Sequence, residues 1–168
     1  MAARRLFIGL MAGRAQEAIT RYQLQYDWPV TVRLTAPSQL HLTLLFLGNV
    51  ELDVERRLSA ALATVPMAPL SLRLTRADMF PGGIAVLKPE GNHSLELLQG
   101  DIAALVQPLG LSLDPKPWVP HVTLARKAQG CVPPQVAPSI EWDVSQFSLV
   151  WSRPEGAGYD VLESWSAA

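Results

Sequence analysis

Two copies of one short pattern constrain this chain more than any other feature. His-x-Thr occurs as His41-Leu42-Thr43 and again as His121-Val122-Thr123, 80 residues further along. Each copy sits in a short apolar run, and the chain has only three histidines. The pair indicates an internally repeated fold that brings two imidazoles together.

Both copies are predicted to lie on β-strands that have one polar and one apolar face. Alternate side chains of a strand share a face. His41 and Thr43 therefore point one way, and the residues expected on the opposite, core-facing side are Leu40, Leu42, Leu44 and Phe46. The second copy repeats this arrangement, since His121 and Thr123 share a face. If the two polar faces meet across a cleft, they assemble two imidazoles and two hydroxyls.

Helical and extended patterns alternate along the rest of the chain. Helical stripes are predicted over 13–26, 54–65 and 95–109, with Gly110 as a C-cap. Extended runs are predicted over 4–10, 40–47, 70–75, 84–87, 121–125, 142–151 and 159–165, with the turn Gly48-Asn49 ending the second of them. Turns at 81–83 and 154–158 predict hairpins and hence antiparallel pairing. These elements favour an α+β fold in which helices cover the outside of the sheet.

Composition narrows the classes of partner. The chain of 168 residues can bury a sizeable core. Its formal net charge is −1, from 14 basic and 15 acidic residues. A long phosphate track requires many lysines and arginines. Nucleic acid is therefore expected to bind at a small site or at an end.

Cysteine usage and the apolar segments point to one compartment. Cys131 is the only cysteine, which excludes an internal disulfide and a thiolate zinc cluster. The N-terminal residues lack the long apolar region and cleavage site of a signal peptide. No stretch approaches the ~20 apolar residues that a membrane span requires. We expect a cytoplasmic, monomeric protein that does not enter a membrane.

The residues of the two motifs suit chemistry on an anionic group. A neutral imidazole can deprotonate water and an imidazolium can protonate a leaving oxygen, since the unperturbed pKa is ~6.5. Threonine hydroxyls can donate hydrogen bonds to phosphoryl oxygens. Neither a metal nor another cofactor is required. The candidate catalytic residues are His41 and His121, and Thr43 and Thr123 are candidates for binding the substrate.

Other interpretations of the histidines stay open. Both could be core residues bonded to backbone carbonyls. A zinc site would need His93 beside His41 and His121, because zinc takes three or four protein ligands, and it would leave the threonines without a role. His93 is instead expected near the surface at the start of a helix. The same pocket could also bind a nucleotide or an RNA end without turnover, or act on small cyclic nucleotides.

The motifs and their flanks resemble the 2H phosphoesterase superfamily. HLTLLFLG and PHVTLAR are similar to its paired HxTx motifs. The opening RLFIGL, the segment WVPHVTLAR and the closing pattern GxxYxxLxxW (156–165) are similar to bacterial RNA 2′,3′-cyclic phosphodiesterases, also called 2′-5′ RNA ligases. The resemblance covers nearly the full chain. It implies one domain over 1–168, bilobal, with two pseudo-symmetric, interleaved lobes of antiparallel sheet and outer helices around a central groove.

The resemblance also implies an activity. Enzymes of this family hydrolyse a terminal 2′,3′-cyclic phosphate of RNA to a 2′-phosphomonoester without a metal, and reverse 2′-5′ ligation is possible. The expected partner is an RNA 3′ end or a nucleotide that carries the cyclic phosphate. By resemblance His41 is the proton donor to the 3′ oxygen, His121 is the base that activates water, and Thr43 and Thr123 hold the phosphate. The two histidines have near-equivalent settings in the sequence, so the division into acid and base rests on the resemblance alone.

A few residues outside the motifs are further candidates. Arg126 follows the second motif, where the family often has a basic residue, and could bind phosphate. Strand alternation counts against this, because a regular strand turns Arg126 away from His121; if the strand ends at Ala125, the arginine can turn back. Trp118 and Tyr159 could stack on a base, with packing as the alternative. The charges interpreted as surface residues are Arg4, Arg5, Lys88 and Arg153.

Overall fold

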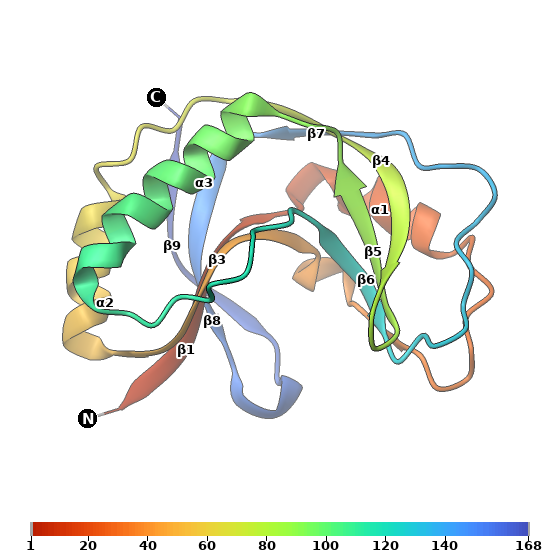
Figure 1. Cartoon of the computed structure of the whole chain (residues 1–168), viewed down its shortest axis with the longest axis horizontal. Helices are drawn as coiled ribbons and strands as arrows, with labels where there is room; N and C mark the ends of the chain where they lie inside the picture. The colour runs from red at the N-terminus through yellow and green to blue at the C-terminus, as the bar shows by residue number, and fades with distance from the viewer. Residues whose placement is uncertain (1, 168) are drawn as a thin grey trace.

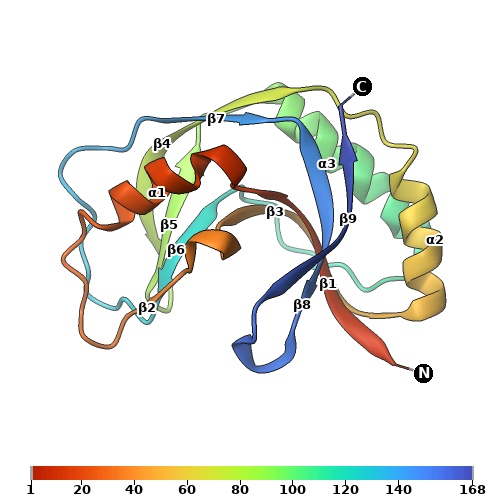
Figure 2. The same cartoon turned by 180° about the vertical axis from the view of Figure 1, so that it is seen from behind.

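The computed structural model describes residues 2–167 of the chain. Over these residues one curled sheet holds nine strands, and every pairing in it is antiparallel. Its path, which Figure 1 shows, runs through β7 (Ile140–Val144), β4 (Leu70–Phe80), β5 (Ile84–Pro89), β6 (Val122–Arg126), β3 (His41–Glu51), β1 (Ala3–Met11), β8 (Gln146–Ser152) and β9 (Tyr159–Ser166). The short strand β2 (Arg33–Leu34), labelled in Figure 2, pairs with β6. The α+β prediction is confirmed.

The sheet consists of two halves that meet at β3 and β6. We call β3, β1, β8 and β9 the first half, and β6, β5, β4 and β7 the second half. The two halves join through the pair Leu42 and Val122, which are the middle residues of the two motifs. The motifs therefore lie side by side at the centre of the molecule. One continuous sheet contains both halves, an arrangement compatible with the two lobes expected from the resemblance, which stay a prediction.

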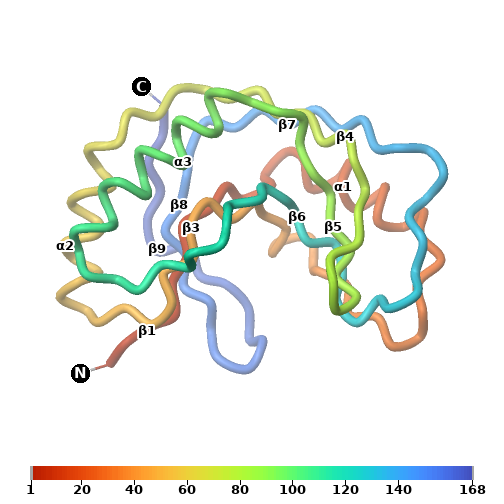
Figure 3. The backbone as a smooth tube through the Cα atoms, in the orientation of Figure 1, coloured from red at the N-terminus to blue at the C-terminus, as the bar shows by residue number. Residues whose placement is uncertain are grey.

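Helices α1 (Gln16–Gln23) and α3 (His93–Val106) each pack beside the half of the sheet to which the strand preceding them does not belong. Helix α1 follows β1 but packs beside the second half, where the Tyr22 hydroxyl donates to the carbonyl of Val136 at 2.9 Å. Helix α3 follows β5 but lies with α2 (Leu52–Leu62) beside the first half, as Figure 2 shows from behind. The tube in Figure 3 shows the chain crossing between the halves each time. Within residues 2–167, no helix has both the length and the apolar character needed to cross a membrane.

Alternation in the sequence builds the core. In β4 the leucines at 70, 72 and 74 are buried, while the intervening Ser71 and Arg73 are exposed. The helical stripes bury one side of α2 and α3 through Leu58, Leu62, Leu95, Leu98, Ile102 and Val106. Gly110 ends the third helical segment in the left-handed region (φ 79°), as predicted.

Two predicted boundaries are wrong. Strand β3 does not end at Gly48 but runs on to Glu51, since Gly48 (φ 69°) continues pairing opposite Leu6. The run expected as one strand over 142–151 is two, β7 and β8, which lie in different halves. Local hydrophobicity does not mark this crossing, because both strands are apolar on one face.

Candidate active site

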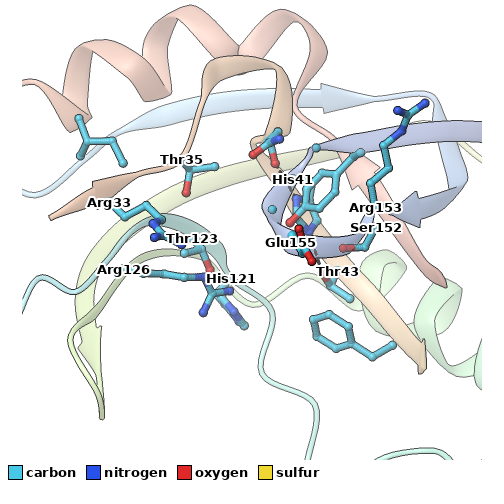
Figure 4. A pocket seen from close by; sticks show the side chains of 16 residues that line it. Arg33, Thr35, His41, Thr43, His121, Thr123, Arg126, Ser152, Arg153 and Glu155 are labelled. Atoms are coloured by element: carbon cyan, nitrogen blue, oxygen red, sulfur yellow. Dashed lines mark hydrogen bonds between the residues drawn. The ribbon is translucent and has the colours of Figure 1, made fainter. Parts of the chain in front are cut away.

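A cavity of about 460 Å³ lies where the two halves meet. All five residues predicted for the site line it: His41, Thr43, His121, Thr123 and Arg126. In Figure 4 the first motif faces the second across the cavity, with Arg126 beside the second. The remaining walls come from β2, from Gln39 of the 3₁₀ turn Pro37–Gln39, and from the β8–β9 connection.

Both histidines are oriented in the same way. The Nδ1 atom of His41 lies 2.7 Å from the carbonyl oxygen of Gln39, and Nδ1 of His121 lies 2.7 Å from that of Val119. A carbonyl can only accept, so Nδ1 carries the proton in each ring. In the neutral ring Nε2 is then the basic atom. The core-histidine alternative foresaw the carbonyl bonds, but the rings are only partly buried and line a cavity.

The two Nε2 atoms have different surroundings. Nε2 of His41 is 3.0 Å from Oγ1 of Thr43, and its ring stacks on Phe7 with 4.6 Å between centroids. Tyr159 meets the same ring edge-on at 5.2 Å. The ring of His121 meets Phe80 edge-on at 4.8 Å. His41 is thus held on two sides by aromatic rings.

A glycine makes room for the stack on His41. A Cβ atom at Gly9 would lie 3.0 Å from the carbonyl oxygen of Leu42 and 3.2 Å from Cε2 of Phe7. Both contacts are shorter than ordinary van der Waals separation. A side chain at this position would displace either the motif strand or the ring that supports His41.

Burial is the main cause that lowers the pKa of both imidazoles. For His41, the nearby charges of His121 and Arg126 lower the pKa further, and the bond to Gln39 opposes them. For His121, burial again lowers the pKa most, the bond to the backbone carbonyl of Val119 opposes it, and the charges of Arg126 and Lys88 lower it further. A bound anion would favour the imidazolium form. Binding of a phosphate group would therefore raise the pKa values of both histidines, which burial lowers in the free protein.

A β-bulge in β6 explains how Arg126 reaches the cavity. Thr123 pairs with Val86 and Ala125 pairs with Ala85, so Leu124 has no partner on β5. One extra residue reverses the alternation of a strand. Arg126 therefore turns toward the cavity although β6 extends to it, and the objection from strand alternation is wrong.

Strand β3 contains a β-bulge at the equivalent position. Thr43 pairs with Gly9 and Leu45 with Ile8, so Leu44 is the extra residue. Phe46, expected to face the core, is 55% exposed and lines the cavity. Phe46 and Arg126 each stand five positions after the histidine of their motif. The repeat therefore places an aromatic ring at one end of the site and a cation at the other.

A glutamine supports each bulge from the helix that crosses over. Nε2 of Gln23, on α1, donates to the carbonyl oxygen of Leu124 at 2.9 Å and to that of Thr35 at 3.2 Å. Nε2 of Gln99, on α3, donates to the carbonyl oxygen of Leu44 at 3.3 Å. A bulge disrupts the ladder and leaves backbone groups to be satisfied elsewhere. Helices α1 and α3 thus hold the two bulges, which direct Arg126 and Phe46 into the cavity.

Arg33 is a site residue that the sequence did not reveal. It stands opposite Arg126 across β2 and β6, and both side chains line the cavity. Like charges directly opposite each other are unfavourable, and no ion pair relieves either arginine within residues 2–167. The pair is therefore suited to an anion between them. Strand β2 has only two residues, too few for any periodic signal.

The other candidates divide between the site and packing. Tyr159 lines the cavity, whereas Nε1 of Trp118 donates to the carbonyl oxygen of Thr43 at 3.0 Å and ties the loop before the second motif to the first. His93 is the exposed first residue of α3, as predicted. Among residues 2–167, no group of three or more His, Cys, Asp or Glu side chains could hold a metal ion, so the three histidines do not form the set that the zinc alternative needs.

Comparison with known proteins places this geometry in a family. Residues 14–155 match the 2′-5′ RNA ligase superfamily. The chain belongs to this superfamily. It is 39% identical over 145 residues to the RNA 2′,3′-cyclic phosphodiesterase of Thermus thermophilus, covering 77% of this chain and 73% of the relative. It is 29% identical over 174 residues to the protein of that name from Escherichia coli, covering 96% of each.

Solved structures of the superfamily share the fold. The crystal structure of Escherichia coli LigT complexed with 3′-AMP superposes with a TM-score of 0.88 at 25% identity, over 99% of each chain. A crystal structure of a Thermus thermophilus protein superposes with a TM-score of 0.84 at 31% identity, covering 96% of this chain and 97% of that one. The resemblance stated from the paired motifs is confirmed.

Proposed function

We propose that this chain is an RNA 2′,3′-cyclic phosphodiesterase that hydrolyses the terminal cyclic phosphate to a 2′-phosphomonoester. The observation that carries the proposal is the pair of opposed imidazoles with Nδ1 bound to backbone carbonyl, beside the arginine pair Arg33 and Arg126. The names of the relatives and the 3′-AMP complex of LigT support it.

The anion binds before the chemistry begins. Arg33 and Arg126 attract the single negative charge of the cyclic phosphodiester, and Thr43 and Thr123 donate hydrogen bonds to its non-bridging oxygens. These four side chains hold the phosphorus between the two imidazoles. The alignment lowers the barrier because water and leaving group are already placed in line.

Two proton transfers complete the reaction. Nε2 of His121 takes a proton from water as the water oxygen forms a bond to phosphorus. The bond between phosphorus and the 3′ oxygen breaks, and that oxygen takes a proton from Nε2 of His41. The products are a 2′-phosphomonoester and a 3′ hydroxyl, and the two imidazoles exchange protons with solvent to reset. His41 neutralises the charge on the leaving oxygen by protonating it, a role that a Lewis-acidic metal ion has in other enzymes. The steps therefore need no metal.

Ligation by transesterification uses the same groups in the same roles. A 5′ hydroxyl of a second RNA takes the place of water, and His121 deprotonates it to form a 2′-5′ linkage. Water at its bulk concentration favours hydrolysis. Every residue of the site comes from one chain, so the proposal requires no second subunit. The monomeric state and cytoplasmic location stay predictions from the sequence.

The test is hydrolysis of an RNA oligonucleotide that ends in a 2′,3′-cyclic phosphate, in the presence of EDTA, with the position of the phosphate determined in the product. We expect a 2′-phosphate, and loss of turnover in His41→Ala and His121→Ala with circular dichroism unchanged. Binding of the oligonucleotide without turnover at any pH would favour the module that only binds RNA ends. A 3′-phosphate product would contradict the assignment of the leaving oxygen.

A further inference from the structure

A second cavity of about 510 Å³ opens from the catalytic one and runs along β1. The two cavities share seven lining residues, which are Phe46, Arg126, Ser152, Arg153, Glu155, Gly156 and Tyr159. Four arginines line the second cavity and Glu155 is its one lining carboxylate. Of the residues that line this second cavity, the proposed mechanism uses only Arg126, so the far end of the cavity has no role in the reaction of the cyclic phosphate.

Arg5 is the cation at the far end. Strand β1 alternates regularly, so Arg5 shares a face with Phe7 and Gly9, whose partners on β3 belong to the site. Arg5 is exposed, stands opposite Asn49, and makes no ion pair within the described residues. Its charge is therefore available to a ligand in the cavity.

The two flanking arginines are already engaged. Arg4 donates three hydrogen bonds to Glu55, two from Nη2 at 2.7 and 2.8 Å and one from Nε at 3.2 Å, and Arg153 pairs with Asp160. Both guanidinium groups also lie against Trp151, with 5.2 and 5.1 Å from Cζ to the ring centroid. They form a fixed wall and leave Arg5 as the free charge of that end.

The other exit from the catalytic cavity has a different character. It leads past Phe46 into a space of about 240 Å³ lined by Trp118, Leu45 and Val119, where Asp114 offsets Lys116. This exit is apolar and suits a base. A phosphodiester chain would be drawn to the arginine-lined cavity instead, because a polyanion follows cationic side chains.

We propose that the second cavity binds the phosphodiester backbone upstream of the terminal nucleotide, with Arg5 contacting one of its phosphates. Arg5 stands four residues along β1 from Gly9, which pairs with Thr43, a separation of about 13 Å along the strand. That distance places Arg5 beyond the cyclic phosphate and in reach of the chain that precedes it. The inference rests on the proposed function and adds that the enzyme favours an oligonucleotide over a mononucleotide.

The experiment compares three substrates in wild type and in Arg5→Gln. They are a nucleoside 2′,3′-cyclic phosphate, a trinucleotide with the same cyclic end, and that trinucleotide with neutral methylphosphonates at both upstream linkages. Arg57→Gln is the matched control, since Arg57 is an exposed arginine of α2 that lines none of these cavities. Initial rates below KM give kcat/KM for each combination.

We expect wild type to favour the anionic trinucleotide, and Arg5→Gln to lower kcat/KM for that substrate by roughly 5- to 10-fold, as for one charged hydrogen bond at an exposed site. The mononucleotide and the neutral trinucleotide should be unaffected, and Arg57→Gln should change nothing. An equal effect of Arg5→Gln on all substrates, or no effect on the anionic trinucleotide, would overturn the proposal. If no substrate were hydrolysed by wild type, the proposed function itself would fail.

Discussion

The two motif strands share the same backbone arrangement and differ in the side chain that this arrangement directs into the cavity. In both, Nδ1 of the histidine bonds to the carbonyl two residues earlier, an extra leucine follows the threonine, and a glutamine from a distant helix holds the carbonyl of that leucine. The residue aimed into the cavity is Phe46 in the first half and Arg126 in the second. A duplicated backbone thus supports a substrate whose two ends differ, one apolar and one anionic.

The largest expected effect separates the two histidines by chemistry. His41→Ala and His121→Ala should each lower kcat by roughly 10²- to 10⁴-fold, the range for loss of a general acid or base. A cyclic phosphate with sulfur in place of the 3′ oxygen has a leaving group that needs no protonation. It should restore much of the activity of His41→Ala and little of that of His121→Ala. Rescue of His121→Ala instead would exchange the two roles.

The arginine pair should give the next largest effect. Arg126→Gln is expected to lower kcat/KM by about 10- to 100-fold, because a charged hydrogen bond to phosphate is lost. Arg33→Gln should lower it less, since Arg33 lies on the separate two-residue strand β2, whereas Arg126 belongs to the strand that carries Thr123. Each change should also raise the melting temperature of the free protein slightly, because it removes repulsion between facing arginines. A lower melting temperature for both variants would contradict a site arranged for an anion.

The glutamines test whether the bulges aim their residues. Gln23→Leu should lower kcat/KM about 10-fold and destabilise the protein by roughly 0.5–1.5 kcal/mol, since the carbonyl of Leu124 loses its side-chain donor but keeps the backbone N–H of Thr35 at 2.9 Å. Gln99→Leu should have a smaller effect, because its bond to Leu44 is longer and only partly buried. If positioning is the cause, Gln23→Leu combined with Arg126→Gln should be no less active than Arg126→Gln alone; additive losses would make Gln23 merely structural.

The pH dependence should give the smallest effect. Both histidine pKa values are lowered by burial, so kcat/KM, which reports the free enzyme, should reach its maximum below pH ~6.5. The bound anion raises these pKa values, so the profile of kcat should lie at higher pH. The two limbs belong to the coupled pair. A kcat/KM maximum well above pH 7 would show that burial does not control the pair.

The same shifts act on stability. A histidine with a lowered folded-state pKa binds fewer protons than in the unfolded chain, so its full contribution is present above pH ~6.5 and is lost as the pH falls below that value. Urea titrations between pH 5 and 8 should show this loss in wild type. His41→Ala should lose less stability over the same interval. An unchanged acid loss in the variant would assign it to other groups.

The sequence by itself determined the superfamily and the class of fold, and it predicted the four motif residues of the site. The repeated His-x-Thr motif requires nothing beyond strand alternation to present His41, Thr43, His121 and Thr123 on polar faces, and the hairpin turns require antiparallel pairing. Apolar periodicity located the helices and most strands. These features are local, since period and turn chemistry are written within a few residues.

Only the tertiary structure decided where Phe46, Arg126 and Arg33 point. A bulge exists through its partner strand, and one extra residue moves every later side chain to the other face. Arg33 enters the site because β2 pairs with β6, a contact between segments almost a hundred residues apart. The exchange of α1 and α3 between the halves likewise depends on which sheet face remains to be covered. Pairing across the chain fixed these positions, and no local pattern in the sequence records it.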